Sequence, residues 1–220
     1  MGNSMIDSIA AVRRIMPVSR ETELRLERYV ALLRRWQPAQ NLVSPRTLPE
    51  IWERHIADSA QLATLFPQAV RWVDIGSGAG LPGMIMGVLL AERPGALVTC
   101  VESNQRKCAF LRAAIRETGA AAVVIEGRIE SVLKQWRDPA DFISARALAS
   151  LDKLLDLTEP LTRQGIAAAF HKGADFASEH VEASQSWSLD LIRHKSMIDP
   201  MSSIIEIRHA ERRSAGLPPS

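Results

Sequence analysis

Four glycines follow a short apolar run in the segment WVDIGSGAGLPG, which spans residues 72–83. Glycine adopts positive φ angles and lets a ligand approach the backbone closely. A helix that begins after such a loop offers free N–H groups at its first turn. In open α/β sheets, ligands bind beyond the carboxyl ends of the strands. The segment therefore predicts a strand, a ligand-binding turn and a helix N-terminus, with these candidate contact residues: Gly76, Gly78, Gly80 and Gly83.

Two cofactor classes fit this spacing. Gly78, Gly80 and Gly83 spell GxGxxG, and Glu102 follows about 20 residues later, as in a dinucleotide-binding fingerprint. Asp74 favours S-adenosylmethionine instead. A carboxylate at the end of a buried strand is costly unless it meets a cationic or hydrogen-bonding group, and the methionyl ammonium is one such group. The sequence also contains no second nucleotide-binding half.

Side chains at the ends of the next two predicted strands complete the expected cofactor site. Glu102 ends the second strand, where an acidic group can accept hydrogen bonds from both ribose hydroxyls. Arg128, Ile129 and Glu130 follow the third strand, where adenine would lie, and Ile129 is expected to pack on its ring. The alternatives are a solvated charge for Glu102 and an ordinary helix start for the other three.

The segment after the fourth predicted strand usually supplies the groups that face the transferred methyl. Here it is SARA (144–147), without the Asn/Asp-Pro-Pro-aromatic motif of N6-adenine enzymes or the Pro-Cys nucleophile of C5-cytosine enzymes. This favours an acceptor with a ready lone pair, such as the Hoogsteen-edge nitrogen of guanine, for which in-line positioning suffices. Arg146 is expected to act by positioning, on the cofactor carboxylate, an RNA phosphate or the guanine; the alternative is a structural ion pair.

The elements that must position these residues alternate between short apolar runs and longer amphipathic segments. Such alternation predicts a mostly parallel sheet with helices on both faces, and the two closely spaced final strands predict an antiparallel edge. This is the Rossmann-like sheet of class I methyltransferases. Strands are expected at 70–75, 96–102, 121–126, 140–144, 165–171, 187–193 and 202–208, and helices at 82–92, 104–118, 128–136, 150–158 and 173–184.

Before the first strand, apolar residues recur at helical spacing over 19–37 and 47–65. Ser19 is the expected N-cap of the first helix, and Pro38 is expected to end it. The predicted organisation is an N-terminal helical layer packed on the core (1–66), an α/β methyltransferase domain (67–208) and a flexible tail (209–220).

Composition excludes several classes of protein. The net charge is only +2 and 46% of the residues are hydrophobic, as in ordinary globular domains. Cys100 and Cys108 form no disulfide framework, and no Cys/His spacing predicts a metal site. No run predicts a membrane span and the N-terminus has the wrong charge order for a secretory signal, so we expect a cytoplasmic monomer. Arginines far outnumber lysines, which permits an RNA partner without deciding for one.

Motifs across residues 36 to 173 resemble the 16S ribosomal RNA (guanine-7)-methyltransferase G family, also called glucose-inhibited division protein B. The matching segments are Trp36 with NLVS at 41–44, RHIADS at 54–59, VDIGSGAGLPG at 73–83, RKCAFLR at 106–112, GRIES at 127–131, ISARALASL at 143–151 and HKG at 171–173. The resemblance implies S-adenosylmethionine-dependent methylation of one guanine in 16S ribosomal RNA, or in the small subunit that contains it, at its seven position. It implies cofactor contacts from Gly76, Leu81, Ile129, Glu130 and Arg146. At the position of Glu102 some members carry aspartate.

Other residues of these motifs have no obvious chemical role. Arg54, His55, Asp58 and Ser59 either dock the helical layer near the cofactor or contact RNA, and His55 is not expected to act as a base because the acceptor needs no deprotonation. Lys172 either meets an RNA phosphate or is a solvated strand end. Two alternative functions also remain: a methyltransferase acting on a small molecule or protein, and a cofactor-binding RNA assembly factor.

Overall fold

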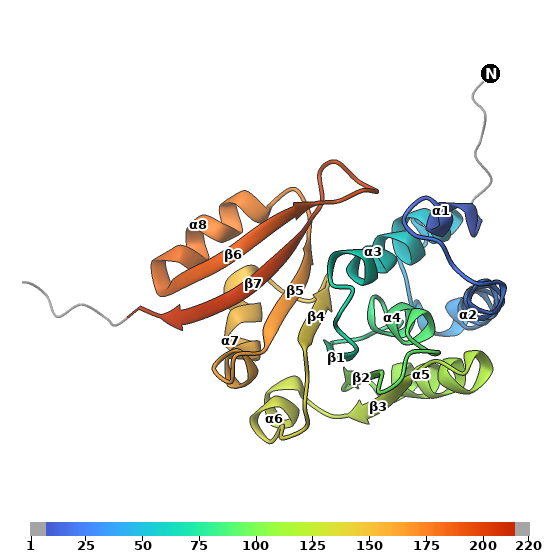
Figure 1. Ribbon diagram of the computed structural model, residues 1–220, viewed down its shortest axis with the longest axis horizontal. Helices are drawn as coiled ribbons and strands as arrows, with labels where there is room; N and C mark the ends of the chain where they lie inside the picture. The colour runs from blue at the N-terminus through green and yellow to red at the C-terminus, as the bar shows by residue number, and fades with distance from the viewer. Residues whose placement is uncertain (1–7, 214–220) are drawn as a thin grey trace, which may run out of the picture.

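The computed structural model describes residues 8–213, and one seven-stranded sheet runs through it (Figure 1). The strand order is β3-β2-β1-β4-β5-β7-β6. The first five strands are mutually parallel, and β7 is antiparallel to both β5 and β6. The predicted mostly parallel sheet with an antiparallel edge is confirmed. The strands are β1 (Arg71–Ile75), β2 (Leu97–Glu102), β3 (Ala122–Glu126), β4 (Phe142–Arg146), β5 (Ala167–Lys172), β6 (Trp187–Lys195) and β7 (Ser203–Arg212).

Helices cover both faces of the sheet because successive strand residues point to opposite sides. Trp72 packs into one apolar cluster with the N-terminal helices, and its neighbour Val73 packs into a second cluster with the helices of the other face. The helical segments are α1 (Ala10–Arg13), α2 (Arg20–Gln40), η1 (Leu48–Glu50), η2 (Trp52–Ala57), α3 (Asp58–Leu65), α4 (Gly83–Leu89), α5 (Gln105–Thr118), α6 (Ile129–Lys134), α7 (Leu151–Thr162) and α8 (Phe176–Ser186).

Helix α2 begins as expected but runs further than expected. The Ser19 hydroxyl accepts the Thr22 N–H at 3.1 Å, which confirms the N-cap. The prediction that Pro38 ends the helix is wrong, because the helix continues to Gln40. Pro38 lies in the last turn, and the buried Gln37 side chain secures that turn by hydrogen bonds to both the N–H and the carbonyl of Val43. Proline has no N–H to donate within the helix, and these side-chain bonds stabilise the last turn instead.

The second N-terminal element is not one regular helix. Its expected range of 47–65 divides into the short segment η1, the π-helical segment η2 and the α-helix α3. The π-helical segment carries Arg54 and His55. Wide π turns interrupt α-helices most often at functional sites, and this one lies beside the end of β4, as the Arg146 contacts below show.

The prediction of a flexible tail over 209–220 is wrong for its first part. Strand β7 continues to Arg212, which pairs with Trp187 of β6. The Arg212 guanidinium also lies over the Trp187 ring, 4.5 Å from its centroid, and forms an ion pair with Asp156. Backbone pairing and these contacts hold residues that composition alone assigned to a tail. Residues 214–220 lie outside the described part. Within residues 8–213, none of the helices combines the length and apolar character of a membrane span.

Candidate cofactor and methyl-transfer site

The glycine loop leaves β1 at the point where the strand order reverses, as expected for a ligand site in an open α/β sheet. Gly78 has a φ of 57°, and a Cβ added to it would meet only the Gly76 carbonyl oxygen, at 3.7 Å. Gly83 is needed for a different reason, because a Cβ there would lie 2.6 Å from the Asp74 carboxylate. The loop is therefore open above Gly78 and tightly packed against Asp74 below.

Glu102 fixes the loop from the neighbouring strand. One of its carboxylate oxygens accepts the Gly78 N–H and the other accepts the Asn104 N–H, each at 2.8 Å. The side chain is buried, yet it lines a pocket at the carboxyl end of the sheet. Each oxygen keeps a second lone pair, so Glu102 can both hold the loop and accept a ligand hydroxyl. It is not the solvated strand-end charge considered as the alternative.

The pocket beside Glu102 has a volume of about 400 Å³ and joins four of the predicted cofactor residues. Its size lies in the range of ordinary ligand pockets. Asp74, Gly78, Gly80, Leu81 and Arg146 are not part of its lining. We call it the cofactor pocket, and it is lined by Gly76, Glu102, Ser103, Lys107, Arg128, Ile129, Glu130, Ala147, Leu148, Ala149, Lys153 and Leu157.

Asp74 is enclosed beneath the glycine loop instead of lining the pocket. Its side chain is only 1% exposed, and one carboxylate oxygen accepts the Ser144 hydroxyl at 2.7 Å. Burial raises the pKa of Asp74 to about 6, although hydrogen bonds from Ser144 and Ser77 oppose the shift. The second oxygen is buried against Gly83, whose N–H also lowers the pKa of Asp74, but it has no hydrogen bond of ordinary geometry among the described residues. Such an orphaned acceptor fits a site that receives a donor from a ligand, so contact with the methionyl ammonium stays a prediction.

Tyr29 supports the loop from the N-terminal layer and was missed in the sequence analysis. Its hydroxyl donates to the Ala79 carbonyl at 2.6 Å, and its ring is fully buried against Phe110. Tyr29 is the only tyrosine of the chain. A tyrosine on the apolar face of a helix needs a partner for its hydroxyl, and that requirement was the one available signal. The N-terminal helical layer therefore holds the backbone of the glycine loop in place.

We expect Tyr29→Phe to weaken cofactor binding about 5- to 10-fold, as for the loss of one buried hydrogen bond. The Ala79 carbonyl would be left unpaired inside a loop that must keep its shape. The maximal rate of transfer at saturating cofactor should stay unchanged. Titration calorimetry and steady-state kinetics measure the two quantities separately. Thr158→Val is the control, since it removes a buried hydroxyl bond in α7 instead. Equal cofactor affinity in the two variants would contradict this role.

Arg146 connects the end of β4 to the π-helical segment. Its guanidinium contacts an Asp58 oxygen at 3.1 Å, the His55 Nδ1 at 2.9 Å and the Arg54 carbonyl at 2.6 Å. The side chain is mostly buried. The structural ion pair considered as an alternative is thus present. Of the two alternatives for Arg54, His55 and Asp58, docking of the helical layer is the one whose contacts the structure contains, and Arg146 belongs to the same network.

His55 is a neutral hydrogen-bonding bridge. A guanidinium only donates, so Nδ1 must accept from Arg146, and Nε2–H must then donate to the Thr47 hydroxyl at 2.8 Å. Burial, followed by the charges of Arg146 and Arg54, lowers the pKa of His55 to about 3. Its only lone pair is occupied by Arg146, which agrees with the expectation that His55 does not serve as a base.

This burial of a neutral histidine makes the protein less stable in acid. An unfolded chain binds a proton at His55 below about pH 6.5, whereas the folded protein does not until about pH 3. The stabilisation is therefore present above pH 6.5 and is lost as the pH falls. Between pH 7 and pH 5, we expect the wild type to lose about 2 kcal/mol more unfolding free energy than His55→Gln. Urea titrations at both pH values measure this. The opposite slope from Asp74 is common to both proteins and cancels, and parallel pH profiles would contradict the expectation.

Lys172 is not a solvated strand end. Its side chain is 8% exposed, and its amine lies 2.5 Å from a Glu179 oxygen and donates to the Ala149 carbonyl. The sequence could not anticipate the partner, because Glu179 lies on α8. Contact with an RNA phosphate stays a prediction, and the phosphate would have to compete with Glu179 for the amine.

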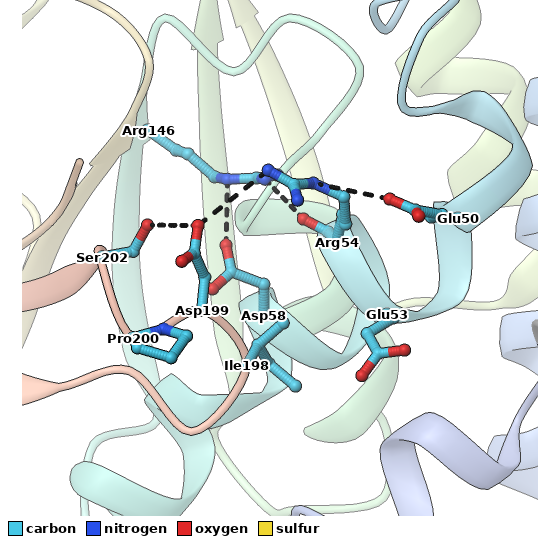
Figure 2. A pocket seen from close by; sticks show the side chains of 9 residues that line it. All are labelled: Glu50, Glu53, Arg54, Asp58, Arg146, Ile198, Asp199, Pro200 and Ser202. Atoms are coloured by element: carbon cyan, nitrogen blue, oxygen red, sulfur yellow. Dashed lines mark hydrogen bonds and ion pairs between the residues drawn. The ribbon is translucent and has the colours of Figure 1, made fainter. Parts of the chain in front are cut away.

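Two further pockets lie around the end of β4. Ala147 lines both the cofactor pocket and a pocket of about 180 Å³, and Arg146, Asp58 and Ser202 line that pocket and a third one of about 320 Å³. Figure 2 shows the third pocket between the π-helical segment, Arg146 and the β6–β7 loop. These shared residues place the three pockets one after another around Ala147 and Arg146. Among residues 8–213, no group of three His, Cys, Asp or Glu side chains could hold a metal ion.

Comparison with known proteins decides the family. A sequence model of the family described as rRNA small subunit methyltransferase G matches residues 22–205. The chain belongs to this family. Ribosomal RNA small subunit methyltransferase G of Bradyrhizobium sp. (strain ORS 278) is 46% identical, with 96% of each chain covered. The protein of the same name from Bradyrhizobium diazoefficiens is 49% identical over 94% of this chain and 79% of its own.

Solved structures confirm the class I fold at low sequence identity. An S-adenosylhomocysteine-bound methyltransferase of Podospora anserina has a TM-score of 0.57 and 15% identity, with 89% of this chain and 98% of that chain covered. A precorrin-6y C5,15-methyltransferase of Geobacter metallireducens has a TM-score of 0.51 and 15% identity, with 77% of this chain and 92% of that chain covered. The predicted family and the predicted fold class are both confirmed.

Proposed function

We propose that this protein transfers a methyl group from S-adenosylmethionine to the seven-position nitrogen of one guanine in 16S ribosomal RNA. The observation that carries the proposal is the cofactor pocket, which joins the glycine loop at Gly76 to Glu102, Ile129 and Glu130. The printed names of the relatives, which identify ribosomal RNA small subunit methyltransferases, support the RNA substrate.

The residues present fit the cofactor. Glu102 would accept the ribose hydroxyls, Ile129 would pack against the adenine, and Gly78 leaves room for a close approach to the loop. The unpartnered oxygen of Asp74, which lies under the glycine loop, would accept a hydrogen bond from a cationic end. When bound, S-adenosylmethionine supplies an electrophilic methyl on a positively charged sulfur.

Transfer needs positioning and no base. The guanine nitrogen attacks the methyl carbon in line, and the electron pair of the breaking carbon–sulfur bond stays on sulfur. The positive charge passes to the guanine ring, and no proton has to leave. Arg146 holds the transfer site by linking β4 to the π-helical segment. Such positioning of two reactants supplies much of the rate enhancement available to a bimolecular reaction.

We further propose that the enzyme acts in the cytoplasm as a monomer and binds its RNA largely through phosphates. Its arginine-rich composition suits bidentate phosphate contacts. Binding dominated by phosphate contacts weakens steeply as the salt concentration rises. A small-molecule or protein methyltransferase would show turnover without RNA and little dependence on salt.

The test uses labelled S-adenosylmethionine and small ribosomal subunits from cells that lack this protein, with naked 16S RNA in parallel. Borohydride reduction and aniline cleavage map any 7-methylguanosine. One new cleavage site in the 16S RNA supports the proposal. Cofactor binding without incorporation into either substrate would contradict it and favour the assembly factor, and turnover without RNA would favour another acceptor.

A further inference from the structure

The third pocket beside Arg146 has an unusual balance of charge for an enzyme of polyanionic RNA. We call it the acidic pocket; it measures about 320 Å³. Four carboxylates and two guanidinium groups line it (Figure 2). Its lining is Glu50, Glu53, Arg54, Asp58, Arg146, Ile198, Asp199, Pro200 and Ser202. Arg14 pairs with Glu53 at 3.0 Å from outside this lining, so one carboxylate remains in excess, and this charge disfavours a phosphate in the pocket.

Ion pairs inside the acidic pocket leave part of this charge available. Asp58 is neutralised by Arg146 at 3.1 Å, whereas Arg54 stands 3.9 Å from both Glu50 and Asp199. At 3.9 Å the charges attract, but the atoms are too far apart to be hydrogen-bonded. One guanidinium is thus shared loosely by two carboxylates, and each carboxylate oxygen keeps a lone pair for a ligand.

Asp199 is held in a fixed orientation. Its two oxygens accept the Met201 N–H at 2.9 Å and the Ser202 hydroxyl at 3.1 Å. The loop that carries it is anchored by the buried Gln61 side chain, which accepts the Met197 N–H at 2.6 Å. A carboxylate held in this way can bind a ligand without first rearranging.

Guanine is the base whose hydrogen-bond donors match such a carboxylate. Its N1–H and N2–H₂ groups are adjacent donors that a carboxylate can accept together, and they lie on the opposite side of the base from the nitrogen that receives the methyl. Adenine presents an acceptor at the corresponding ring nitrogen and would meet repulsion. The methylated guanine ring is cationic, so neighbouring carboxylates stabilise the charge as it develops. Met197 and Met201 stand exposed on the same loop, where apolar side chains can contact unstacked bases.

We propose that the acidic pocket receives the target guanine and that Asp199 accepts hydrogen bonds from its donor edge. This inference rests on the proposed function, since it names the acceptor site of the same reaction. The pockets lie in the required order, because Ala147 lines the cofactor pocket and the middle pocket of about 180 Å³, and Arg146 lines the middle pocket and the acidic pocket. The base would have to be turned out of the folded RNA to enter.

The test compares Asp199→Asn with Glu182→Gln, which removes one carboxylate charge from an exposed position on α8. Transfer to small ribosomal subunits is measured at saturating cofactor, together with cofactor affinity and the melting temperature. We expect Asp199→Asn to lower kcat/KM for the subunit about 10- to 100-fold, as for the loss of a charge-assisted hydrogen bond. Its cofactor affinity and melting temperature should match those of the control.

Glu50→Gln is the second variant, since Glu50 is largely exposed and its amide form should leave folding intact. It should lower kcat/KM for the subunit about 3- to 10-fold, with the cofactor affinity unchanged. If both variants behaved like Glu182→Gln while the wild type methylated the RNA, the assignment of the acidic pocket would be overturned and the proposed function would stand. An equal loss of cofactor affinity and of transfer in Asp199→Asn would also overturn it. A wild type that methylates no RNA would overturn the proposed function and this inference together.

Discussion

Gly78→Asp should weaken cofactor binding by at least about 100-fold, because the new carboxylate would occupy the open space above the loop. It would also stand beside Glu102, whose carboxylate already accepts the N–H of residue 78 at 2.8 Å. Two like charges at such short range repel each other, and the ribose would lose its acceptor. Titration calorimetry with S-adenosylhomocysteine measures the affinity directly.

Gly95→Asp provides a matched control. Gly95 also has a positive φ, 75°, and a Cβ there would meet no atom within 4 Å. Both substitutions place aspartate in a left-handed conformation, which costs about 1–2 kcal/mol for a residue with a side chain. The backbone cost is therefore matched, Gly78→Asp should melt somewhat lower because Glu102 repels the new carboxylate, and only Gly78→Asp should lose the cofactor. An unchanged affinity in Gly78→Asp would remove this loop from the cofactor site.

Arg146→Ala should reduce methyl transfer by at least about 100-fold, since it removes the group that links β4 to the π-helical segment. The structure also predicts a loss of stability in this variant. Asp58 would be left buried without its cationic partner, at a cost of about 3–5 kcal/mol. Thermal unfolding and single-turnover transfer assays measure the two effects.

A double variant separates stability from function at this site. Arg146→Ala combined with Asp58→Asn removes the unpaired charge, so the melting temperature should recover toward that of the wild type. Transfer should remain low, because the contacts to His55 and the Arg54 carbonyl are still absent. If transfer recovered together with the melting temperature, Arg146 would have only a structural role.

The sequence determined the sheet, its antiparallel edge and the place of the cofactor loop. Alternating apolar runs specify strands and helices locally, and a glycine-rich turn after the first strand must lie at the carboxyl end of a parallel sheet. The same argument predicts that four residues lie together, and they do line one pocket: Gly76, Glu102, Ile129 and Glu130. Local signals failed at two segment ends that side-chain bonds or strand pairing determine. Gln37 binds Val43 across the end of α2 after Pro38, and Arg212 of β7 pairs with Trp187 of β6.

The tertiary structure alone decided which side chains meet. The partnership of Arg146 with Asp58 and His55 joins residues about 90 positions apart, and nothing in the sequence spacing specifies it. Tyr29 reaches the glycine loop from another layer, and Lys172 is buried against α8. Periodicity reveals whether a side chain is buried, but burial free energy does not depend on which partner covers it. Hydrogen bonds and ion pairs do depend on the partner, and the packing of distant elements determines that choice.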